Sequence, residues 1–555
     1  MAYIDWIVLA ITLAFIVFYG AWKSLRDRNG GGFLRGDDQS WFTMGVSVMA
    51  TQASAITFLS APGLGYESGL RFVQFYFGLP LAIILVCAVF VPLYYRLNVY
   101  TAYEFLEKRF DVRVRLFTAF LFLVQRGLAA GITIFAPALI LSTILGWRLD
   151  VTNLVVGVLV IIYTVSGGTK AVSMTQKWQM GVIMLGLVFS FVLLLNDIAP
   201  HLTFSETLHF AGTLDKMKAI DFSFDLSERY TVWSGLTGGF FLALSYFGTD
   251  QSQVQRYLGG KSISESRAGL LFNAVLKIPM QFFILFIGVM VFVFFTIERP
   301  PLHFNETAVL LLSDSAAQQV ELREKKFDKI HEEIKRNRIW WKDDAMRESI
   351  APQLQSYIAQ ESKLRSEVKE IIAHEQEEAK DTNYVFLYFV LNHLPKGIIG
   401  LIIAMILSAA MSSTASELNA LTTTTAVDFY QRIGKRKANL FASRLITVGW
   451  GLLAILFAML ANLFDNLIEM VNLLGSLFYG TILGVFVVAF FIKPIRGSGV
   501  FPAAIVSQIA VLSLHYWQSH GGPQLGYLWY NLVGCLAVVV LSSILHLMIK
   551  SQYAR

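Results

Sequence analysis

A run of hydroxyl side chains inside an apolar segment has the residue types best suited to hold a cation. The run reads Ser408-Ala409-Ala410-Met411-Ser412-Ser413-Thr414-Ala415-Ser416-Glu417-Leu418-Asn419, and Thr422 to Thr425 follow. Sodium is a hard cation and takes oxygen ligands from hydroxyls and from carbonyls freed where a membrane helix unwinds. Ser412 and Ser413, with the Ala409 carbonyl one turn earlier, would supply oxygens from one side of a sodium site.

Two other apolar segments contain small and polar residues that predict interrupted helices. One contains Ala50-Thr51-Gln52-Ala53-Ser54-Ala55-Ile56-Thr57, and its freed carbonyls would complete the sodium site. The other contains Gly235, Gly238, Gly239 and Gly248 together with Ser245, Thr249 and Asp250. Because small residues also let membrane helices pack closely, either stretch alone is equally compatible with a packing surface.

Two charged side chains, Arg126 and Glu417, fall inside apolar segments. Ionisable residues are costly in a membrane and are functional candidates by default. The planar guanidinium of Arg126 matches a carboxylate geometrically, which predicts an anionic substrate. The alternatives are an internal pair of Arg126 with Asp250 or Glu417, or a side chain that reaches towards the cytoplasmic surface.

The composition predicts an all-α integral membrane protein whose main partner is the lipid bilayer. Of 555 residues, 55% are hydrophobic and 15% are charged, and runs of roughly 20 apolar residues are long enough to cross a bilayer as helices. We predict about thirteen transmembrane helices, at 3–22, 41–61, 69–97, 113–145, 151–166, 174–196, 232–257, 267–297, 385–411, 440–461, 466–492, 499–517 and 525–549. The first run lacks a cationic leader and a cleavage site, so it is expected to be a retained helix.

The charges between these runs predict the orientation in the membrane. Lys and Arg are concentrated in alternate loops, for example Arg96, Lys108 and Arg109, whereas the other short loops have few charges. The positive-inside rule places the N-terminus outside and the C-terminus in the cytoplasm of a multi-pass cell membrane protein, with a bacterial cytoplasmic membrane as the expected site. Topology accounts for the net charge of +6, so no nucleic-acid partner is implied.

The order of the runs predicts five regions. They are a peripheral first helix with a cytoplasmic loop (1–40), a first set of five helices (41–196), an external loop (197–231), a second set of five (232–492) and two C-terminal helices (493–555). Since five is odd, the second set enters the membrane from the opposite side, which gives a 5+5 inverted repeat with flanking helices.

The second set includes a charged external insertion at 299–384. Its apolar residues recur at helical spacing and predict short amphipathic helices: Leu354, Tyr357, Ile358, Leu364, Val368, Ile371 and Ile372. A gate, a binding site for a partner and a simple solvated decoration all remain open.

With these motifs in this order, the chain resembles the sodium/solute symporter family, and in local motifs its vitamin, monocarboxylate and iodide branch. The motifs are Gly63-Leu64-Gly65-Tyr66, Tyr103-Glu104-Phe105-Leu106, Ala136-Pro137-Ala138-Leu139, Ser166-Gly167-Gly168, Gln253-Val254-Gln255-Arg256-Tyr257 and the serine-rich stretch. The resemblance implies a leucine-transporter-like fold, alternating access and Na+ as the coupling ion. By position it implies a sodium site made of the carbonyls of Ala50, Ala53 and Ala409 and the hydroxyls of Ser412 and Ser413.

One departure from the family concerns a second sodium ion. Most members have an acidic residue after the Gly-Gly motif that contributes to a second site, whereas this chain has Gln176 there. A one-sodium stoichiometry is therefore the simplest expectation. Alternatively, Glu417, with Ser416, replaces the missing charge and holds a second cation or a proton, or Glu417 forms a salt bridge with a Lys or Arg.

The resemblance also indicates a substrate pocket. Thr57 and Tyr76 match sugar-binding positions of the sugar-transporting members, which use longer amide or acidic groups there, and Tyr246 matches their aromatic inner gate. Further candidates are Gln52, Gln74, Phe247 and Asn472, each of which could instead be a packing residue, and Arg126.

The function predicted from the sequence is a sodium-coupled symporter, not an enzyme, that imports a small organic solute, with an anion such as a carboxylate expected. The alternatives are a sodium-coupled sugar, polyol or amino-acid symporter, or a membrane sensor that keeps the symporter fold. No His-Glu-x-x-His or comparable catalytic motif occurs in the sequence.

Overall fold

The computed structural model describes residues 1–25, 39–97, 99–375, 379–435, 438–460 and 466–553, which are predominantly helical. Within these ranges, nine helices are long and apolar enough to cross a membrane, and two shorter apolar helices cover Tyr3–Ile16 and Leu149–Val165. The only β contact in the described ranges is an isolated bridge between Gln39 and Gly260. The prediction of an all-α membrane protein is therefore confirmed, while part of the basic loop at 26–38 lies outside the described residues.

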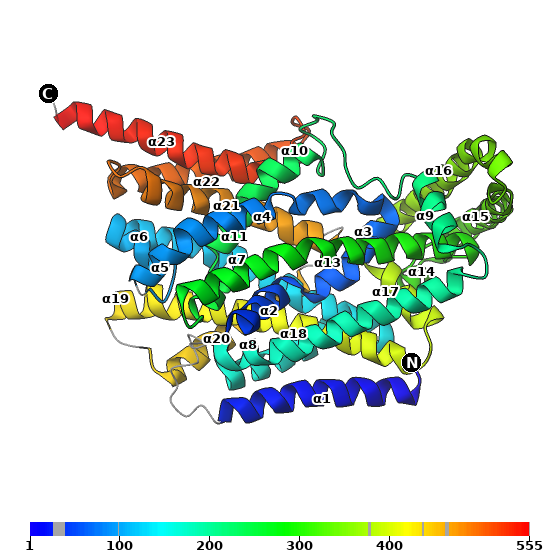
Figure 1. Ribbon diagram of the computed structural model, residues 1–555, viewed down its shortest axis with the longest axis horizontal. Coiled ribbons are helices and arrows are strands. Elements are labelled where there is room, and N and C mark those ends of the chain that lie inside the picture. The colour runs from blue at the N-terminus through cyan, green and yellow to red at the C-terminus, as the bar shows by residue number, and fades with distance from the viewer. Residues whose placement is uncertain (26–38, 98, 376–378, 436–437, 461–465, 554–555) are drawn as a thin grey trace.

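The helices form a bundle in which α1 lies along one outer edge (Figure 1). The first group of α-helices is α1 (Tyr3–Leu25), α2 (Trp41–Gln52), α3 (Ala55–Ser68), α4 (Leu79–Leu85), α5 (Val91–Leu97), α6 (Glu104–Arg109), α7 (Val112–Leu145), α8 (Leu149–Ile198) and α9 (Phe204–Thr213). The second is α10 (Val232–Ser234), α11 (Phe240–Gly248), α12 (Gln251–Leu258), α13 (Ile263–Ile297), α14 (Glu306–Leu310), α15 (Asp314–Trp341), α16 (Asp344–Glu375) and α17 (Val385–His393). The last is α18 (Ile398–Thr424), α19 (Arg432–Gly434), α20 (Leu440–Met459), α21 (Leu467–Phe491), α22 (Gly497–Ser519) and α23 (Trp529–Tyr553).

Short 3-10 and π-helical segments connect several of these helices. The 3-10 segments are η1 (Gly69–Tyr76) and η4 (Thr382–Tyr384). The π-helical segments are η2 (Val86–Phe90), η3 (Gly235–Gly239) and η5 (Thr425–Gln431).

Two membrane helices are interrupted where the sequence predicted breaks. The first break is at Ala53 and Ser54, between α2 and α3, and the second at Thr249 and Asp250, between α11 and α12. In Figure 1, α3 lies to the right of α2 while α11 lies to the left of α10, so the two broken helices run in opposite directions. This is the relation that the predicted inverted repeat requires.

The structure corrects the boundaries of the serine-rich helix. The predicted span 385–411 is in fact two helices, α17 and α18, separated at Leu394–Gly397. Pro395 disfavours helical conformation in the residue before it, and Gly397 has a φ of 93°, which favours glycine. Because α18 continues to Thr424, the run 408–419 lies in the middle of a helix rather than at its end.

The predicted spans 151–166 and 174–196 are joined in one long helix, α8. The hydroxyls of Tyr163 and Thr175 lie 2.5 Å apart, although a straight helix would separate residues twelve positions apart by about 18 Å along its axis. The chain therefore bends sharply between these residues, with an apolar helix of its own on each side, Leu149–Val165 and Thr175–Ile198.

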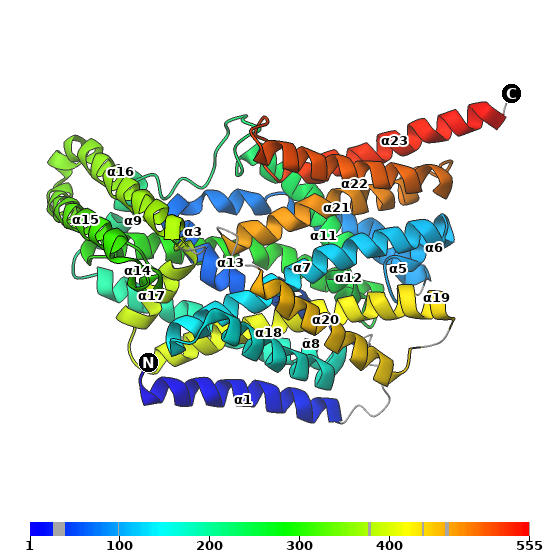
Figure 2. The same cartoon turned by 180° about the vertical axis from the view of Figure 1, so that it is seen from behind.

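The charged insertion forms a hairpin of two long helices, α15 and α16, instead of short helices. Figure 2 shows the hairpin beside α9 at the end of the bundle opposite α6 and α19. The predicted apolar stripe is on α16, where Leu354, Leu364, Val368 and Ile372 are buried. The helices are long because charged residues on their other faces are solvated while this stripe packs against α15 and the bundle.

A salt-bridge network fastens the hairpin to the external end of α3. Lys369 lies 3.2 Å from Glu67 and 2.7 Å from Asp381, and the Thr382 hydroxyl donates to Glu67 at 2.6 Å. Burial disfavours the charged form of Lys369, but Asp381 and Glu67 outweigh burial and raise the pKa of Lys369. The insertion is thus held against a helix that also borders the central cavity described below.

The first helix is attached to the bundle through a buried carboxylate. Asp5 is fully buried, and its Oδ1 accepts hydrogen bonds from the backbone N–H groups of Gly397 (2.5 Å) and Gly400 (3.2 Å). These groups belong to the start of α18, whose first N–H groups have no partner within the helix. Asp5 therefore caps the serine-rich helix from a neighbouring element.

We expect Asp5→Ala to lower the free energy of unfolding by about 1–2 kcal/mol, because it removes a cap from α18. Thermal unfolding of the detergent-solubilised full chain measures the change. Asp5→Asn, which keeps an acceptor oxygen, should have a smaller effect, and Asp150→Ala, at an exposed first-turn carboxylate of α8, should have almost none. Equal destabilisation by Asp5→Ala and Asp150→Ala would contradict the capping role.

Candidate functional site

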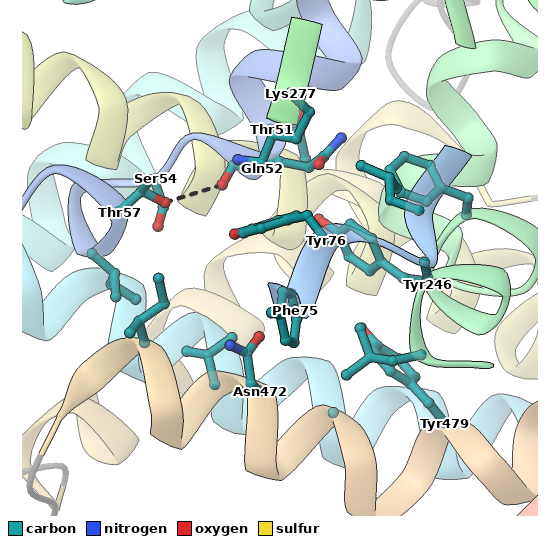
Figure 3. A pocket seen from close by; sticks show the side chains of 18 of the residues that line it. Thr51, Gln52, Ser54, Thr57, Phe75, Tyr76, Tyr246, Lys277, Asn472 and Tyr479 are labelled. Carbon is teal, nitrogen blue, oxygen red and sulfur yellow. Dashed lines mark hydrogen bonds between the residues drawn. The ribbon is translucent and has the colours of Figure 1, made fainter. Parts of the chain in front are cut away.

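A cavity lies beside both helix breaks and is bordered by α2, α3, α7, α11, α13, α18 and α21. Its lining residues are Thr51, Gln52, Ser54, Ile56, Thr57, Phe75, Tyr76, Leu79, Arg126, Thr133, Gly239, Leu242, Ala243, Tyr246, Phe247, Lys277, Glu417, Ile468, Val471, Asn472, Gly475 and Tyr479. Figure 3 shows Gln52 and Lys277 on one side of the cavity, Asn472 on the other, and Tyr76 between them. The combination of apolar walls with a few polar groups is typical of small-molecule sites.

Seven of the eight predicted substrate residues line this cavity: Gln52, Thr57, Tyr76, Arg126, Tyr246, Phe247 and Asn472. Gln74 is not among the lining residues. Its amide donates to the Tyr230 carbonyl at 2.9 Å and accepts from the Asp221 N–H at 2.8 Å. Gln74 thus ties η1 to the external loop.

Of the residues predicted to bind sodium, Ser412 on α18 and Ala50 on α2 are in contact beside the break between α2 and α3, and Ser413 bonds within α18. The Ser412 hydroxyl donates to the Ala50 carbonyl at 3.4 Å, and the Ser413 hydroxyl donates to the Ala409 carbonyl at 3.0 Å. The carbonyl of Ala50 belongs to the last turn of α2, where carbonyls have no helical partner. Ala53 is buried at the break itself, so the donor set of two hydroxyls and helix-end carbonyls fits a hard cation.

A second group of oxygens, beside the first, is occupied by an amide. The side-chain nitrogen of Gln176 donates to the hydroxyls of Ser412 (2.8 Å), Ser416 (3.0 Å) and Thr51 (3.3 Å). The Ser47 hydroxyl donates to the amide oxygen of Gln176. A neutral amide thus satisfies oxygens that, with an acid at position 176, would be available to a cation.

Arg126 forms the internal pairs with Asp250 and Glu417 that were one of its three interpretations. Nη1 lies 3.0 Å from Glu417 Oε1, and Nη2 donates to Asp250 Oδ2 and, at 2.5 Å, to the Tyr479 hydroxyl. Arg126, Asp250 and Glu417 are at most 5% exposed. The guanidinium therefore faces the cavity with both terminal nitrogens engaged.

Lys277 is a cavity residue that the sequence analysis missed. It is 2% exposed, and its ammonium lies 5.5 Å from the centre of the Tyr76 ring. Within the described ranges, no carboxylate is paired with it. A lone lysine inside the apolar run 267–297 was the available signal, since it is as costly in lipid as Arg126.

Tyr479 was also missed, because a tyrosine in an apolar run is common in membrane helices. Its hydroxyl donates to Asp250 Oδ2 at 2.7 Å, and the Ser245 hydroxyl donates to its carbonyl at 3.0 Å. Tyr479 thereby joins α21 to α11 and to the second helix break.

A separate ionic network lies at the end of the bundle that carries α6 and α19. Arg115 contacts Glu107 at 2.8 Å and Asp428 at 2.7 Å, and Glu107 also contacts Arg432 at 2.6 Å. The Thr101 hydroxyl donates to Asp428 at 2.9 Å. These contacts tie α6, α7 and η5 together on this side of the cavity.

The described residues contain no group of three or more His, Cys, Asp or Glu side chains placed to hold a metal ion. Oxygen ligands from hydroxyls and carbonyls, as in the α2/α18 site, are the donors that suit sodium instead.

Comparison with known proteins identifies the family. The model of the sodium:solute symporter family matches residues 33–308 and 366–507, so α15 and most of α16 lie outside the match. The sodium/sialic acid symporter SiaT of Proteus mirabilis is 26% identical over 98% of this chain and 94% of its own length. A solved outward-open, substrate-bound structure of a Na+-coupled sialic acid symporter superposes with a TM-score of 0.74 at 26% identity, covering 99% of this chain and 98% of that one.

Two other relatives are more similar over shorter stretches. The human sodium/iodide cotransporter is 32% identical over 53% of this chain and 46% of its own length. The sodium-coupled monocarboxylate transporter 1 of Xenopus laevis is 32% identical over 49% of this chain and 44% of its own length. The chain thus spans about half the length of these two relatives.

The family match covers more than half of the chain, and these relatives are transporters, which confirms the prediction that the protein is not an enzyme and supports Na+ as the coupling ion. The chain belongs to the sodium:solute symporter family.

Proposed function

We propose that this protein uses the sodium gradient to import a small organic solute that carries one anionic group. The observation that carries the choice of substrate is Lys277, a buried cation that lines the cavity and has no carboxylate partner in the described part of the chain. An unpaired ammonium is costly in a membrane interior, and a carboxylate on the solute would offset this cost. The names of the sialic acid and monocarboxylate relatives agree with an anionic substrate.

Transport of sodium and solute would be coupled because both bind beside the break between α2 and α3. Sodium held by Ala50, Ala53, Ala409, Ser412 and Ser413 would fix α2 and α3 against α18, next to the cavity lined by Gln52 and Thr57. A ligand shifts a conformational equilibrium only through its different affinity for the two states. Sodium bound in the outward-facing state would therefore complete the substrate site, and the inward membrane potential would add about 2.3 kcal/mol per charge per 100 mV.

One sodium ion per cycle is the proposed stoichiometry. The Gln176 amide donates to Ser416 and Thr51, so these oxygens already have a hydrogen-bond donor in the place of a second cation, while Ser412, to which the amide also donates, belongs to the proposed first site. The alternative in which Ser416 and Glu417 hold a second cation finds less support, because Glu417 Oε1 is paired with Arg126 and its Oε2 accepts from Thr133.

The proposed topology keeps the N-terminus outside and the C-terminus in the cytoplasm of a bacterial cell. The two termini lie at opposite ends of the bundle, with the α15–α16 hairpin on the side of the N-terminus (Figure 1). Termini at opposite ends of the bundle agree with this arrangement, and the charged insertion would then lie outside. A partner bound at 299–384 stays a prediction.

Sodium-driven uptake into proteoliposomes tests the proposed function. With an inward sodium gradient, a labelled carboxylate from a panel that also contains a sugar, a polyol and an amino acid should accumulate. Ser412→Ala/Ser413→Ala should abolish this accumulation, because both hydroxyl ligands are lost. Ser408→Ala, one turn earlier on α18 with a buried hydroxyl, is the matched control and should retain uptake.

Uptake of the sugar, polyol or amino acid alone would overturn the anionic substrate but not symport. Sodium binding without uptake of any solute in a broad panel would favour the sensor alternative.

Lys277→Met should weaken the apparent affinity for the transported anion by about tenfold to hundredfold, the effect of one charged hydrogen bond. The sodium dependence measured at saturating solute should change little. Gln281→Met, one turn further along α13 and outside the cavity lining, controls for repacking of the helix. Unchanged solute affinity in Lys277→Met would contradict the role of the ammonium.

Gln176→Asp should create a second sodium site, because it removes the donating amide and adds a negative charge beside Ser412 and Ser416. We expect the Hill coefficient for sodium to rise from about one towards two, with a matching change in charge moved per solute. Gln176→Asn, similar in size but neutral, should not show this change. An unaltered sodium stoichiometry in Gln176→Asp would contradict the proposal that the Gln176 amide takes the place of a second sodium ion.

A further inference from the structure

The Arg126 end of the cavity contains two carboxylates and one guanidinium. Glu417 and Asp250 both contact Arg126, and they are its only carboxylate partners among the residues that the structure describes. The three formal charges sum to minus one, while Lys277 is the formal positive charge elsewhere on the cavity wall. At the Arg126 end of the cavity, the guanidinium is already neutralised and the net charge is negative. This end would therefore repel a second anionic group on a solute.

The two carboxylates differ in what else they do. Asp250 Oδ1 accepts from the backbone N–H and the hydroxyl of Ser252, at 2.8 and 2.6 Å, and so caps α12 at the helix break. Glu417 lies in the middle of α18, where it caps no helix, and its other oxygen accepts from the Thr133 hydroxyl at 2.8 Å. Asp250 is therefore needed for local structure, whereas Glu417 makes its side-chain hydrogen bonds, within the described part of the chain, to Arg126 and Thr133.

Glu417 also lies at the surface of the cavity, together with Arg126 and Thr133. A carboxylate from a solute in this cavity would approach the same nitrogen, Nη1, that Glu417 Oε1 contacts at 3.0 Å. Removal of the Glu417 side chain would leave the Arg126 Nη1 and the Thr133 hydroxyl as donors facing the vacated space. These are the donors that a carboxylate needs.

We propose that Glu417 helps to determine substrate specificity, because its carboxylate pairs with the Arg126 guanidinium in the place that a carboxylate of the solute would otherwise take. It keeps the Arg126 end closed to a carboxylate of the solute and leaves Lys277 as the cation that receives the anionic group. This inference rests on the proposed function only in that the cavity is the substrate site; the occupied guanidinium itself can be tested without transport.

The experiment measures binding of acetate to the detergent-purified full chain through its thermal unfolding midpoint, with chloride replaced by acetate at constant sodium. We expect Glu417→Ala to be stabilised saturably, with an apparent affinity for acetate about tenfold to hundredfold above that of the wild type, as for one charged hydrogen bond. Glu417→Gln, which retains an oxygen near Arg126, should show a smaller gain.

Two controls identify the site of the effect. Arg126→Gln added to Glu417→Ala should abolish the acetate response, because the cation is gone. Glu469→Ala removes a carboxylate from another Arg–Glu pair, with Arg229, whose side chain is more than half exposed, and should give no saturable response.

Folded Glu417→Ala and Glu417→Gln proteins that respond to acetate no more than the wild type would overturn the proposal, as would a response that persists without Arg126. Variants that cannot be recovered folded even with acetate present would also count against it, because acetate should replace the missing carboxylate. A variant that folds only with acetate would support it. Since the assay needs no solute gradient, its failure is distinct from a failure of sodium-driven uptake.

Discussion

Every backbone N–H and C=O group of a membrane-spanning segment must find a partner inside the protein, and the rest of this structure depends on that constraint. Helices satisfy it, so an interruption is tolerated only where the freed groups line a cavity or meet side chains. The break at Ala53 and Ser54 faces the hydroxyls of α18, and the break at Thr249 and Asp250 is capped by the Asp250 side chain. The polar site exists because the helices are broken there.

The buried charged side chains differ in whether they also find a partner within the protein. Arg126 is neutralised by Asp250 and Glu417, which come from two elements far apart in sequence, while Lys277 has no acidic partner among the described residues. Gln176 satisfies a set of hydroxyls without any charge. The cavity is thus lined by an arginine with two carboxylate partners and by a lysine without an acidic partner among the described residues, beside the hydroxyls and carbonyls where α18 meets the first helix break.

The α15–α16 hairpin lies largely outside the family match, yet it is attached to a helix that borders the cavity. The family match stops at residue 308 and resumes at 366, so α15 and the first two-thirds of α16 are additional. Lys369, near the end of α16, nevertheless contacts Glu67 at the end of α3, the helix that follows the first break. The insertion is thereby connected to the element whose movement alternating access would require.

The sequence by itself determined the membrane class, the approximate spans, both helix breaks and seven residues of the cavity lining, because hydrophobic length and polar residues in apolar runs are local signals. It could not place the end of α17, the bend in α8 or the length of the hairpin, which depend on packing. It left open whether Arg126 meets a solute or a carboxylate of the chain, and it missed Lys277 and Tyr479. Only the tertiary structure decided these points, because a buried charge is defined by the partners that distant helices bring to it.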